Sequence, residues 1–359
     1  MELLKDLYSP SFFERFINLV KEKYPSFDGD RFRVSIYDGN WDTEAFKQRM
    51  RHITCSLTET LPSSYPEALE VLTAVAPQCR GVEYLFFPDF IELNGLGSYE
   101  LSMEFLQTFT PYSSSEFAVR PFLLREPGLT LEHMKRWARH ENEHVRRLAS
   151  EGCRPRLPWA SNLPALREDP RPILPILETL KEDPSEYVRK SVANNLNDIS
   201  KDHPELVLEL AKGWYGKNPA TNWIVKHGCR SLLRKGDSRA LSLFGYEEIR
   251  NISVHALDVI TGSIAEGENL EFSFRLVNES EDVQALRVDY EIGYRKKNGM
   301  LAPKRFKLTE KPFGPGAHPL AKRHSFKLLT TRTYYAGEHE VRILVNGTPM
   351  AAVSFEFTE

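Results

Sequence analysis

A short helical motif recurs along this chain at a nearly constant spacing. Residues 143–147 (EHVRR) align with residues 186–190 (EYVRK) at an offset of 43 residues, and residues 222–226 (NWIVK) follow 36 residues further on. A period of about 40 residues is typical of HEAT-like repeats, in which stacked helix pairs bury one continuous core. The sequence therefore predicts an α-solenoid, a curved row of helix pairs with a concave face.

Most of the N-terminal sequence has helical periodicity. Residues 9–24 place an apolar stripe on one face, with Ser9 or Ser11 as the candidate N-cap. Further helical patterns, separated by Pro, Gly and Ser, cover residues 64–77, 98–110 and 116–126. We predict a mainly α protein, with a HEAT-like repeat domain over residues 1–248.

The pattern changes beyond Tyr246 to short alternating runs punctuated by turn residues. The runs cover residues 254–260, 269–278, 286–295, 324–330 (HSFKLLT), 337–347 and 351–359. About seven short strands in a segment of this length are typical of an immunoglobulin-like β-sandwich. We assign residues 249–359 to such a domain.

Composition restricts the class of protein. The 359 residues are 41% hydrophobic and 27% charged, and no apolar run approaches the roughly 20 residues that a membrane span needs. The first residues are charged and amphipathic, unlike a secretory signal. The cysteines lack CxxC spacing, which favours free thiols in a reducing cytosol over disulfides or zinc. We expect a cytoplasmic, monomeric protein without membrane contact, metal or cofactor.

One helical segment carries polar residues that a structural repeat does not require. Asn194, Asn195, Asn197 and Asp198 crowd the segment after residues 186–190, although Asn and Asp are poor helix formers. We interpret these residues as selected by something other than folding.

Spacing of i, i+4 and i+8 places side chains on one stripe of a helix. Three such stripes occupy equivalent places in neighbouring repeats: Arg147 and Glu151 with Arg154 just beyond; Lys190, Asn194 and Asp198; and Lys226, Arg230 and Arg234. Stacked repeats would set the stripes side by side, giving a surface with basic flanks and carboxylates in the middle.

Simpler interpretations stand beside this one. Asp198 pairing with Lys201, and Glu151 with Arg147, would be ordinary surface ion pairs of little energetic value. Trp159 is either a plug between repeats or an aromatic face of a site. Arg154 and Arg156 lie on either side of a proline, and two guanidinium groups on a rigid turn suit phosphate binding better than a core.

As a set, these segments resemble the AlkC family of DNA alkylation repair glycosylases, relatives of the AlkD glycosylases within the HEAT-like-repeat class. The resemblance rests on residues 145–159 (VRRLASEGCRPRLPW), 183–206 (DPSEYVRKSVANNLNDISKDHPEL) and 222–241 (NWIVKHGCRSLLRKGDSRAL), and it extends upstream through residues 51–72 and 114–124. It covers essentially the whole helical region in collinear order. Some family members carry an immunoglobulin-like C-terminal domain and others lack it.

The resemblance implies a monofunctional DNA glycosylase that removes cationic bases, chiefly 3-methyladenine and 3-methylcytosine, from double-stranded DNA. It also implies that carboxylates matching Glu116, Glu151 and Asp198 lie against the deoxyribose of the lesion, and that Trp159 matches the family tryptophan. We expect Asp198 to position water, Glu151 and Glu116 to give electrostatic support, and Trp159 to add cation–π attraction.

The residues that we expect to contact DNA are mostly cationic. The net charge is −3, but whole-chain charge averages opposing patches. The expected contacts are Arg147, Arg154, Arg156, Lys190, Asn194, His227, Arg230 and Arg234 in the helical region, and Lys296 and Lys297 at a hairpin tip of the sandwich.

Two other functions fit the same features less well. A non-catalytic HEAT-type scaffold for a protein partner predicts an apolar groove, whereas these stripes are charged. A non-catalytic DNA-binding or damage-sensing protein needs the cations, but three carboxylates would weaken its binding to a polyanion.

Overall fold

The structure, a computed structural model, describes residues 4–37, 39–327 and 332–358. The chain divides by its internal contacts into two compact units, Met1–Asp202 with Tyr215–Gly228, and His203–Trp214 with Cys229–Glu359. Helices give way to strands between Leu243 and Ile252, around the predicted boundary at residues 248 and 249. The two compact units do not coincide with the predicted domains, because three helices group with the strands in the second unit. The predicted domain limits therefore stay a prediction.

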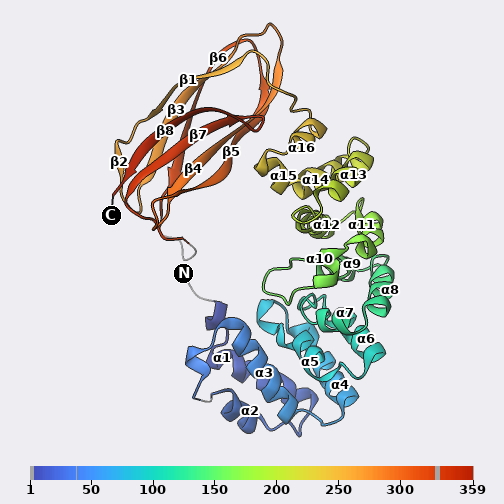
Figure 1. Cartoon of the computed structure of the whole chain (residues 1–359). Helices are drawn as coiled ribbons and strands as arrows, with labels where there is room; N and C mark the ends of the chain where they lie inside the picture. The colour runs from blue at the N-terminus through green and yellow to red at the C-terminus, as the bar shows by residue number, and fades with distance from the viewer. Residues whose placement is uncertain (1–3, 38, 328–331, 359) are drawn as a thin grey trace. The chain divides into compact units, whose positions relative to one another are not determined.

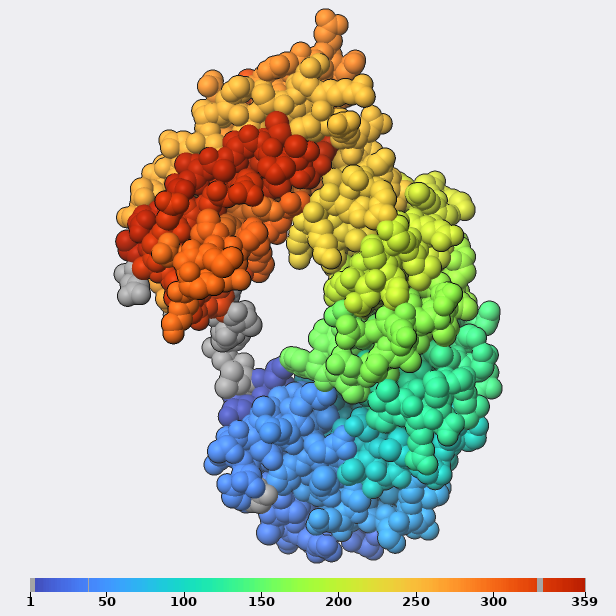
Figure 2. Space-filling view, viewed as in Figure 1, coloured from blue at the N-terminus to red at the C-terminus, as the bar shows by residue number. Residues whose placement is uncertain are grey.

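The first unit is helical. Its α-helices are α1 (Pro10–Lys23), α2 (Gly29–Ile36), α3 (Phe46–Thr60), α4 (Tyr65–Val75), α5 (Phe86–Asn94), α6 (Tyr99–Phe109), α7 (Arg120–Arg125), α8 (Pro127–Trp137), α9 (Glu143–Gly152), α10 (Pro164–Glu168), α11 (Leu174–Leu180), α12 (Glu186–Ile199) and α14 (Pro219–Gly228). Short 3-10 helices cover Leu4–Leu7, Trp41–Thr43, Ala76–Gln78, Val82–Tyr84 and Arg171–Ile173. Figure 1 follows these helices as a curved row, and Figure 2 shows their side chains packed without a break from blue to green.

The predicted start of the first helix is confirmed. Ser9 is the N-cap of α1, and its hydroxyl accepts a hydrogen bond from the Phe12 amide over 3.3 Å. The apolar stripe of α1, which includes Phe13 and Phe16, is buried. Both rings belong to an aromatic core with Phe32 and with rings of α5.

The 43-residue repeat is visible in matching side-chain contacts. Arg146 donates from Nη1 to the carbonyls five and six residues before it, at 2.7 and 3.0 Å. Arg189, its counterpart one repeat later, makes the same two bonds at 2.8 and 2.7 Å. Each arginine thereby caps the turn that leads into its helix. The helices also stack in order, since α9 packs against α12 and α12 against α14. The predicted α-solenoid is confirmed.

The second unit holds the β-sandwich with α13 (Pro204–Trp214), α15 (Arg230–Lys235) and α16 (Ser238–Leu243). Its strands are β1 (Ile252–Val259), β2 (Ser263–Ile264), β3 (Asn269–Asn278), β4 (Gln284–Arg295), β5 (Leu301–Phe313), β6 (Gly316–Ser325), β7 (Gly337–Val345) and β8 (Thr348–Phe357). They form a three-stranded sheet in the order β1-β3-β6 and a five-stranded sheet in the order β2-β8-β7-β4-β5. All neighbours are antiparallel except β2 and β8.

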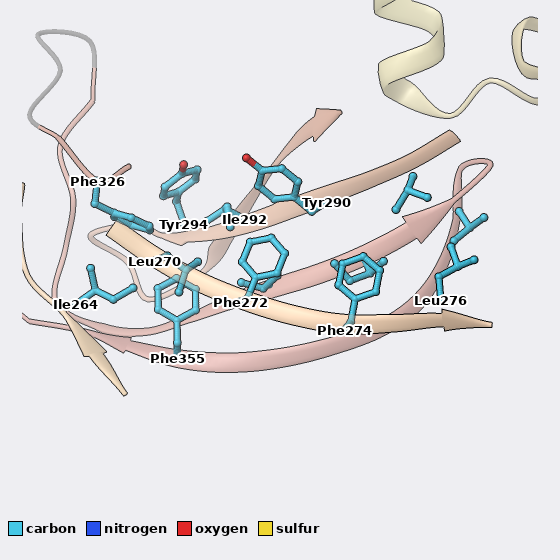
Figure 3. Close-up of a cluster of buried hydrophobic side chains, with 14 of the residues drawn as sticks. Ile264, Leu270, Phe272, Phe274, Leu276, Tyr290, Ile292, Tyr294, Phe326 and Phe355 are labelled. Atoms are coloured by element: carbon cyan, nitrogen blue, oxygen red, sulfur yellow. The ribbon is translucent and has the colours of Figure 1, made fainter. Parts of the chain in front are cut away.

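The core of the sandwich follows the two-residue period of its strands. Figure 3 shows Phe272 and Phe274 of β3 facing Tyr290, Ile292 and Tyr294 of β4. Alternate residues of β3 are buried between the sheets, as the alternating sequence predicts. In β4 the residues between the core side chains are mostly buried as well.

The strand predicted over residues 324–330 is met only at its start. Strand β6 covers residues 324 and 325 and then ends, residues 326 and 327 are not in a strand, and residues 328–330 lie outside the described residues. Strand β5 was not predicted from the sequence either. Both strands are rich in Lys and Arg and contain proline, so they resemble basic loops. Each lies at the edge of its sheet, where charge and proline are tolerated.

The predicted single stripe of Lys226, Arg230 and Arg234 was also wrong. The helix that carries Lys226 ends at Gly228, and Arg230 begins α15 in the second unit. Gly228 lies tightly against α12, where an added Cβ would meet the Leu196 Cβ at 2.9 Å. This close contact lies at the residue where α14 ends. The predicted spacing had assumed one continuous helix from Lys226 to Arg234.

Candidate active site

Two helices from consecutive repeats supply the centre of the site. Asn142 caps α9 by accepting from the His144 amide at 2.8 Å, and α12 begins 43 residues later. Ser150 of α9 joins the helices, since its hydroxyl accepts from Ser191 at 3.0 Å and its carbonyl from Asn195 at 2.9 Å. Asn195 therefore contributes to packing, which corrects the interpretation that folding gains nothing from it.

A glycine at the end of α9 lets the segment with Glu116 approach. An added Cβ at Gly152 would meet Val119 Cγ1 at 2.6 Å, so this position accepts no larger side chain without rearrangement. The segment before α7 therefore lies directly against α9. The close approach places Glu116 within reach of the helix that carries Glu151.

Arg147 joins the first two predicted carboxylates. Its Nη1 donates to Oε2 of Glu116 at 3.1 Å and to the Ser114 hydroxyl at 2.9 Å. Its Nη2 lies 3.6 Å from Oε1 of Glu151. The guanidinium also covers the ring of Tyr187, 4.6 Å from its centroid. One cation thus holds a residue of the loop, a residue of α9 and the aromatic face of α12.

Arg154 joins the second and third carboxylates. It donates from Nη1 to Oε1 of Glu151 at 2.6 Å and from Nε to Oδ2 of Asp198 at 2.9 Å. The other oxygen of Asp198 accepts from Nζ of Lys201 at 3.0 Å. The result is an alternating series of charges that runs from Glu116 to Lys201, and we call it the carboxylate cluster. The structure brings together all three carboxylates predicted from the sequence.

The carboxylate cluster is largely removed from solvent. The exposed fractions are 9% for Glu116, 5% for Glu151 and 2% for Asp198. Burial alone would lower the pKa of Arg147, but Glu116 and Glu151 outweigh it and raise that pKa. Arg154 behaves likewise, because Glu151 and Asp198 raise its pKa against the effect of burial. Both guanidinium groups therefore remain charged and balance the acidic groups.

The ion pairs anticipated from spacing are present but differ from ordinary surface pairs. Lys201 pairs with Asp198, and Arg147 lies near Glu151, as the simpler interpretations held. Asp198 and Glu151 are nevertheless buried. Buried pairs of this kind carry large desolvation costs and depend on complete sets of partners.

Trp159 does not plug the space between repeats. Its side chain is 62% exposed, and its backbone has φ 63°, a left-handed conformation that is uncommon outside glycine. It lies on the loop between α9 and α10, which Figure 1 shows as a green connection extending from the helices. Of the two interpretations of Trp159, the exposed aromatic face is the one that fits.

The residues predicted to bind phosphate occupy varied environments. Arg154 is 7% exposed and pairs with carboxylates, and Arg156 makes a bidentate pair with Asp202 at 2.6 and 2.9 Å. Lys190 pairs with Glu186 on the surface of α12. Asn194 lies on the same helix and is half-buried, as is Arg230. The ring of His227 stacks on Trp223, with ring centroids 5.0 Å apart. The remaining residues are exposed: Arg234, Lys296 and Lys297. Phosphate contact by these residues stays a prediction.

Two residues around the site were missed as functional candidates by the sequence analysis. Lys47 of α3 donates to the Trp159 carbonyl at 2.7 Å, and Arg120 donates to carbonyls at both ends of the loop that carries Trp159. Arg120 belongs to a segment that carries the family resemblance, which was an available signal. Lys47 gave no signal, because 112 residues separate it from its partner.

Two kinds of feature are absent from the part of the chain that the structure describes. The described residues contain no group of three or more His, Cys, Asp or Glu side chains that could hold a metal ion. No helix within residues 4–37, 39–327 and 332–358 combines the length and apolar character needed to cross a bilayer.

Comparison with known proteins places this geometry in a family. Residues 112–232 match the family described as DNA alkylation repair enzyme, and residues 253–359 match the C-terminal Ig-like domain of protein YhaZ. The chain is 46% identical to the uncharacterized protein YhaZ of Bacillus subtilis strain 168, over 98% of this chain and 99% of that protein. It also matches the solved structure of the Pseudomonas fluorescens alkylpurine DNA glycosylase AlkC, bound to DNA containing an abasic site analogue. That match covers 100% of both chains, with 39% identity and a TM-score of 0.97.

The chain belongs to the AlkC family. The family predicted from the sequence is thereby confirmed, as is the order of a helical-repeat region followed by an Ig-like domain. The AlkC match runs over both compact units, so each has its counterpart in that protein.

Proposed function

We propose that this protein is a monofunctional DNA glycosylase that releases cationic alkylated bases, chiefly 3-methyladenine and 3-methylcytosine, from double-stranded DNA. The observation that carries the proposal is the carboxylate cluster, in which Glu116, Glu151 and Asp198 are held by shared arginines. The full-length match to an AlkC glycosylase bound to abasic-site DNA supports the same activity.

The chemistry follows from the charge of the lesion. A base methylated at N3 is a cation and leaves as a neutral molecule, because the electron pair of the breaking N-glycosidic bond passes to the base. The base therefore needs no general acid. The remaining barrier is the positive charge that develops on the deoxyribose, followed by bonding of a water oxygen to C1′ and loss of its proton.

Preorganised carboxylates lower that barrier. Negative groups fixed beside C1′ stabilise the developing oxocarbenium charge without having to reorganise during the reaction. We assign water positioning and proton acceptance to Asp198, and electrostatic support to Glu151 and Glu116. Trp159 presents an exposed indole, and an aromatic face attracts a cationic sugar or base.

The cluster also explains how buried carboxylates tolerate a polyanion nearby. Arg147, Arg154 and Lys201 balance Glu116, Glu151 and Asp198 in formal charge. The site as a whole does not repel phosphates, although each carboxylate alone would. Local negative charge is thereby available at the sugar without a net repulsive field over the duplex.

DNA contact outside the cluster is assigned to the predicted cations. If several of them neutralise phosphates, the affinity for DNA should fall steeply as the salt concentration rises. Each neutralised phosphate adds roughly 0.9 to the slope of log affinity against log salt concentration. The exposed Lys296 and Lys297 at the β4–β5 turn would give the sandwich its own contact. We further propose that the protein works as a monomer in the cytosol without a cofactor.

The test is direct measurement of the released base. DNA treated with an N3-methylating agent is incubated with the protein, and the supernatant is separated by chromatography, with unmethylated DNA as the control. We expect free 3-methyladenine and 3-methylcytosine, and abasic sites in strands that remain unbroken until treated with base. DNA binding without release would instead indicate a damage-sensing protein, and neither binding nor release would indicate a scaffold. Strand cleavage during release would contradict a monofunctional enzyme.

A further inference from the structure

The loop that carries Trp159 needs support from its surroundings. The segment 153–163 joins α9 to α10, and Trp159 within it is both exposed and left-handed at φ 63°. Such a conformation is sparsely populated for a residue with a Cβ, so it persists only where neighbouring groups hold it. The contacts to this segment therefore show what fixes the backbone at Trp159.

Arg120 fixes the two ends of the segment. It is fully buried, and its Nη1 donates to the carbonyls of Gly152 and Arg154 at 2.9 Å each. Its Nε and Nη2 donate to the Ser161 carbonyl at 2.8 and 2.6 Å. The fixed fork of a guanidinium suits such a set of acceptors, which a lysine ammonium does not match. The middle of the segment, with Trp159, lies between these ends.

Lys47 holds that middle part. Its Nζ donates to the Trp159 carbonyl at 2.7 Å, and the same ammonium lies 4.4 Å from the centroid of the Phe117 ring. Phe117 directly follows Glu116. Lys47 therefore links α3 to the two segments that carry Trp159 and the first carboxylate of the cluster.

We propose that Lys47 is a positioning residue for Trp159, which it holds by its backbone carbonyl so that the indole faces the substrate. The inference rests on the proposed glycosylase function. It goes beyond that function because Lys47 lies on a helix outside the repeats that supply the carboxylates. The alternative for a half-buried lysine on a DNA-binding protein is contact with a phosphate, and the two roles predict different results.

The first experiment measures the segment itself. Hydrogen–deuterium exchange of a peptide that covers residues 156–162 is compared for wild type, Lys47→Met and Lys47→Arg. We expect faster exchange in Lys47→Met, wild-type protection in Lys47→Arg, which keeps a donor, and no change in α12. Lys23→Met, which removes a lysine paired with Glu22 on α1, is the matched control. Unchanged exchange in Lys47→Met overturns the proposal, and this readout does not depend on any enzymatic activity.

The second experiment is a double-mutant cycle on base release. We expect Lys47→Met to lower the single-turnover rate by roughly ten- to a hundredfold, as misplacement of a catalytic group does, with DNA affinity unchanged. In a Trp159→Ala background the same substitution should have no further effect, because the group that it positions is gone. An equal loss in both backgrounds, or a loss of affinity instead of rate, assigns Lys47 to phosphate binding and overturns the proposal.

The two experiments separate the inference from the proposed function. If wild type releases no base, the proposed function fails, while hydrogen exchange still decides whether Lys47 holds the segment. If wild type releases base but Trp159→Ala releases it equally fast, the glycosylase assignment stands and the positioning role is overturned.

Discussion

Arg154 donates from Nε to Oδ2 of Asp198 over 2.9 Å, across 44 residues of sequence. The same guanidinium binds Glu151 of the preceding repeat. A single side chain therefore sets the spacing between two carboxylates that come from neighbouring helices.

Replacing Arg154 should cost a large share of the stability. In Arg154→Met the buried Glu151 and Asp198 lose their shared partner, and breaking a buried ion pair costs about 3–5 kcal/mol. Urea unfolding of wild type and variant measures the difference. Arg171→Met, which removes an exposed pair with Asp169, should leave the midpoint unchanged. A loss for Arg154→Met no larger than in this control would show that the cluster tolerates unpaired carboxylates.

The stability of the sandwich should depend on His324. Its ring nitrogens lie 2.9 and 2.8 Å from the hydroxyls of Tyr290 and Tyr294. Burial, and then the charges of Arg332, Lys322 and Lys304, lowers the pKa of His324 to about 4, whereas the unfolded chain has the ordinary value of 6.5. Between pH 6.5 and about pH 4 the unfolded state thus binds up to one more proton than the folded state, so the stability present above pH 6.5 is lost as the pH falls through this range.

The variant His324→Gln keeps hydrogen-bonding capacity but cannot titrate. We expect its unfolding free energy to fall less than that of wild type between pH 6.5 and pH 4, when both are measured by urea titration at each pH. His255→Gln, at an exposed position on β1, is the control and should keep the wild-type dependence. Parallel curves for His324→Gln and wild type would contradict a neutral, half-buried histidine.

The hairpin tip of the sandwich gives a prediction about salt. If Lys296 and Lys297 each neutralise one phosphate, the double variant to alanine should reduce the log–log salt slope of DNA binding by about 1.8. Fluorescence anisotropy with duplex DNA over a range of salt concentrations measures the slope. Lys23→Ala, on α1, is the control. A slope equal to that of wild type would remove the tip from the DNA contact.

Sequence periodicity predicted the repeat architecture because that signal is local. The offset between Arg146 and Arg189 was readable, and both arginines make the same contacts in the structure. The cap at Ser9 followed from the same kind of reasoning. The bounds of strands β5 and β6 were not predicted, because edge strands rich in lysine, arginine and proline lack the alternation of apolar residues that marks a buried strand.

The carboxylates of the candidate site could be predicted from the sequence, whereas the basic residues that pair with them were harder to predict. Helical spacing predicted Glu151 and Asp198, and the family resemblance added Glu116. Spacing could not show that Arg154, just past the end of α9, turns back to a buried carboxylate of the next repeat. Nor could it show Lys47, because long-range contacts to a backbone carbonyl leave no pattern in a single sequence.

The most direct test of the proposed mechanism is the single-turnover release of 3-methyladenine by wild type and Asp198→Asn. The substitution keeps the size of the side chain and removes its negative charge. We predict a loss of rate on the order of 10²-fold or more, with DNA affinity retained and with Asp169→Asn at the wild-type rate. Release by a folded Asp198→Asn at the wild-type rate would contradict the assignment of the reaction to the carboxylate cluster.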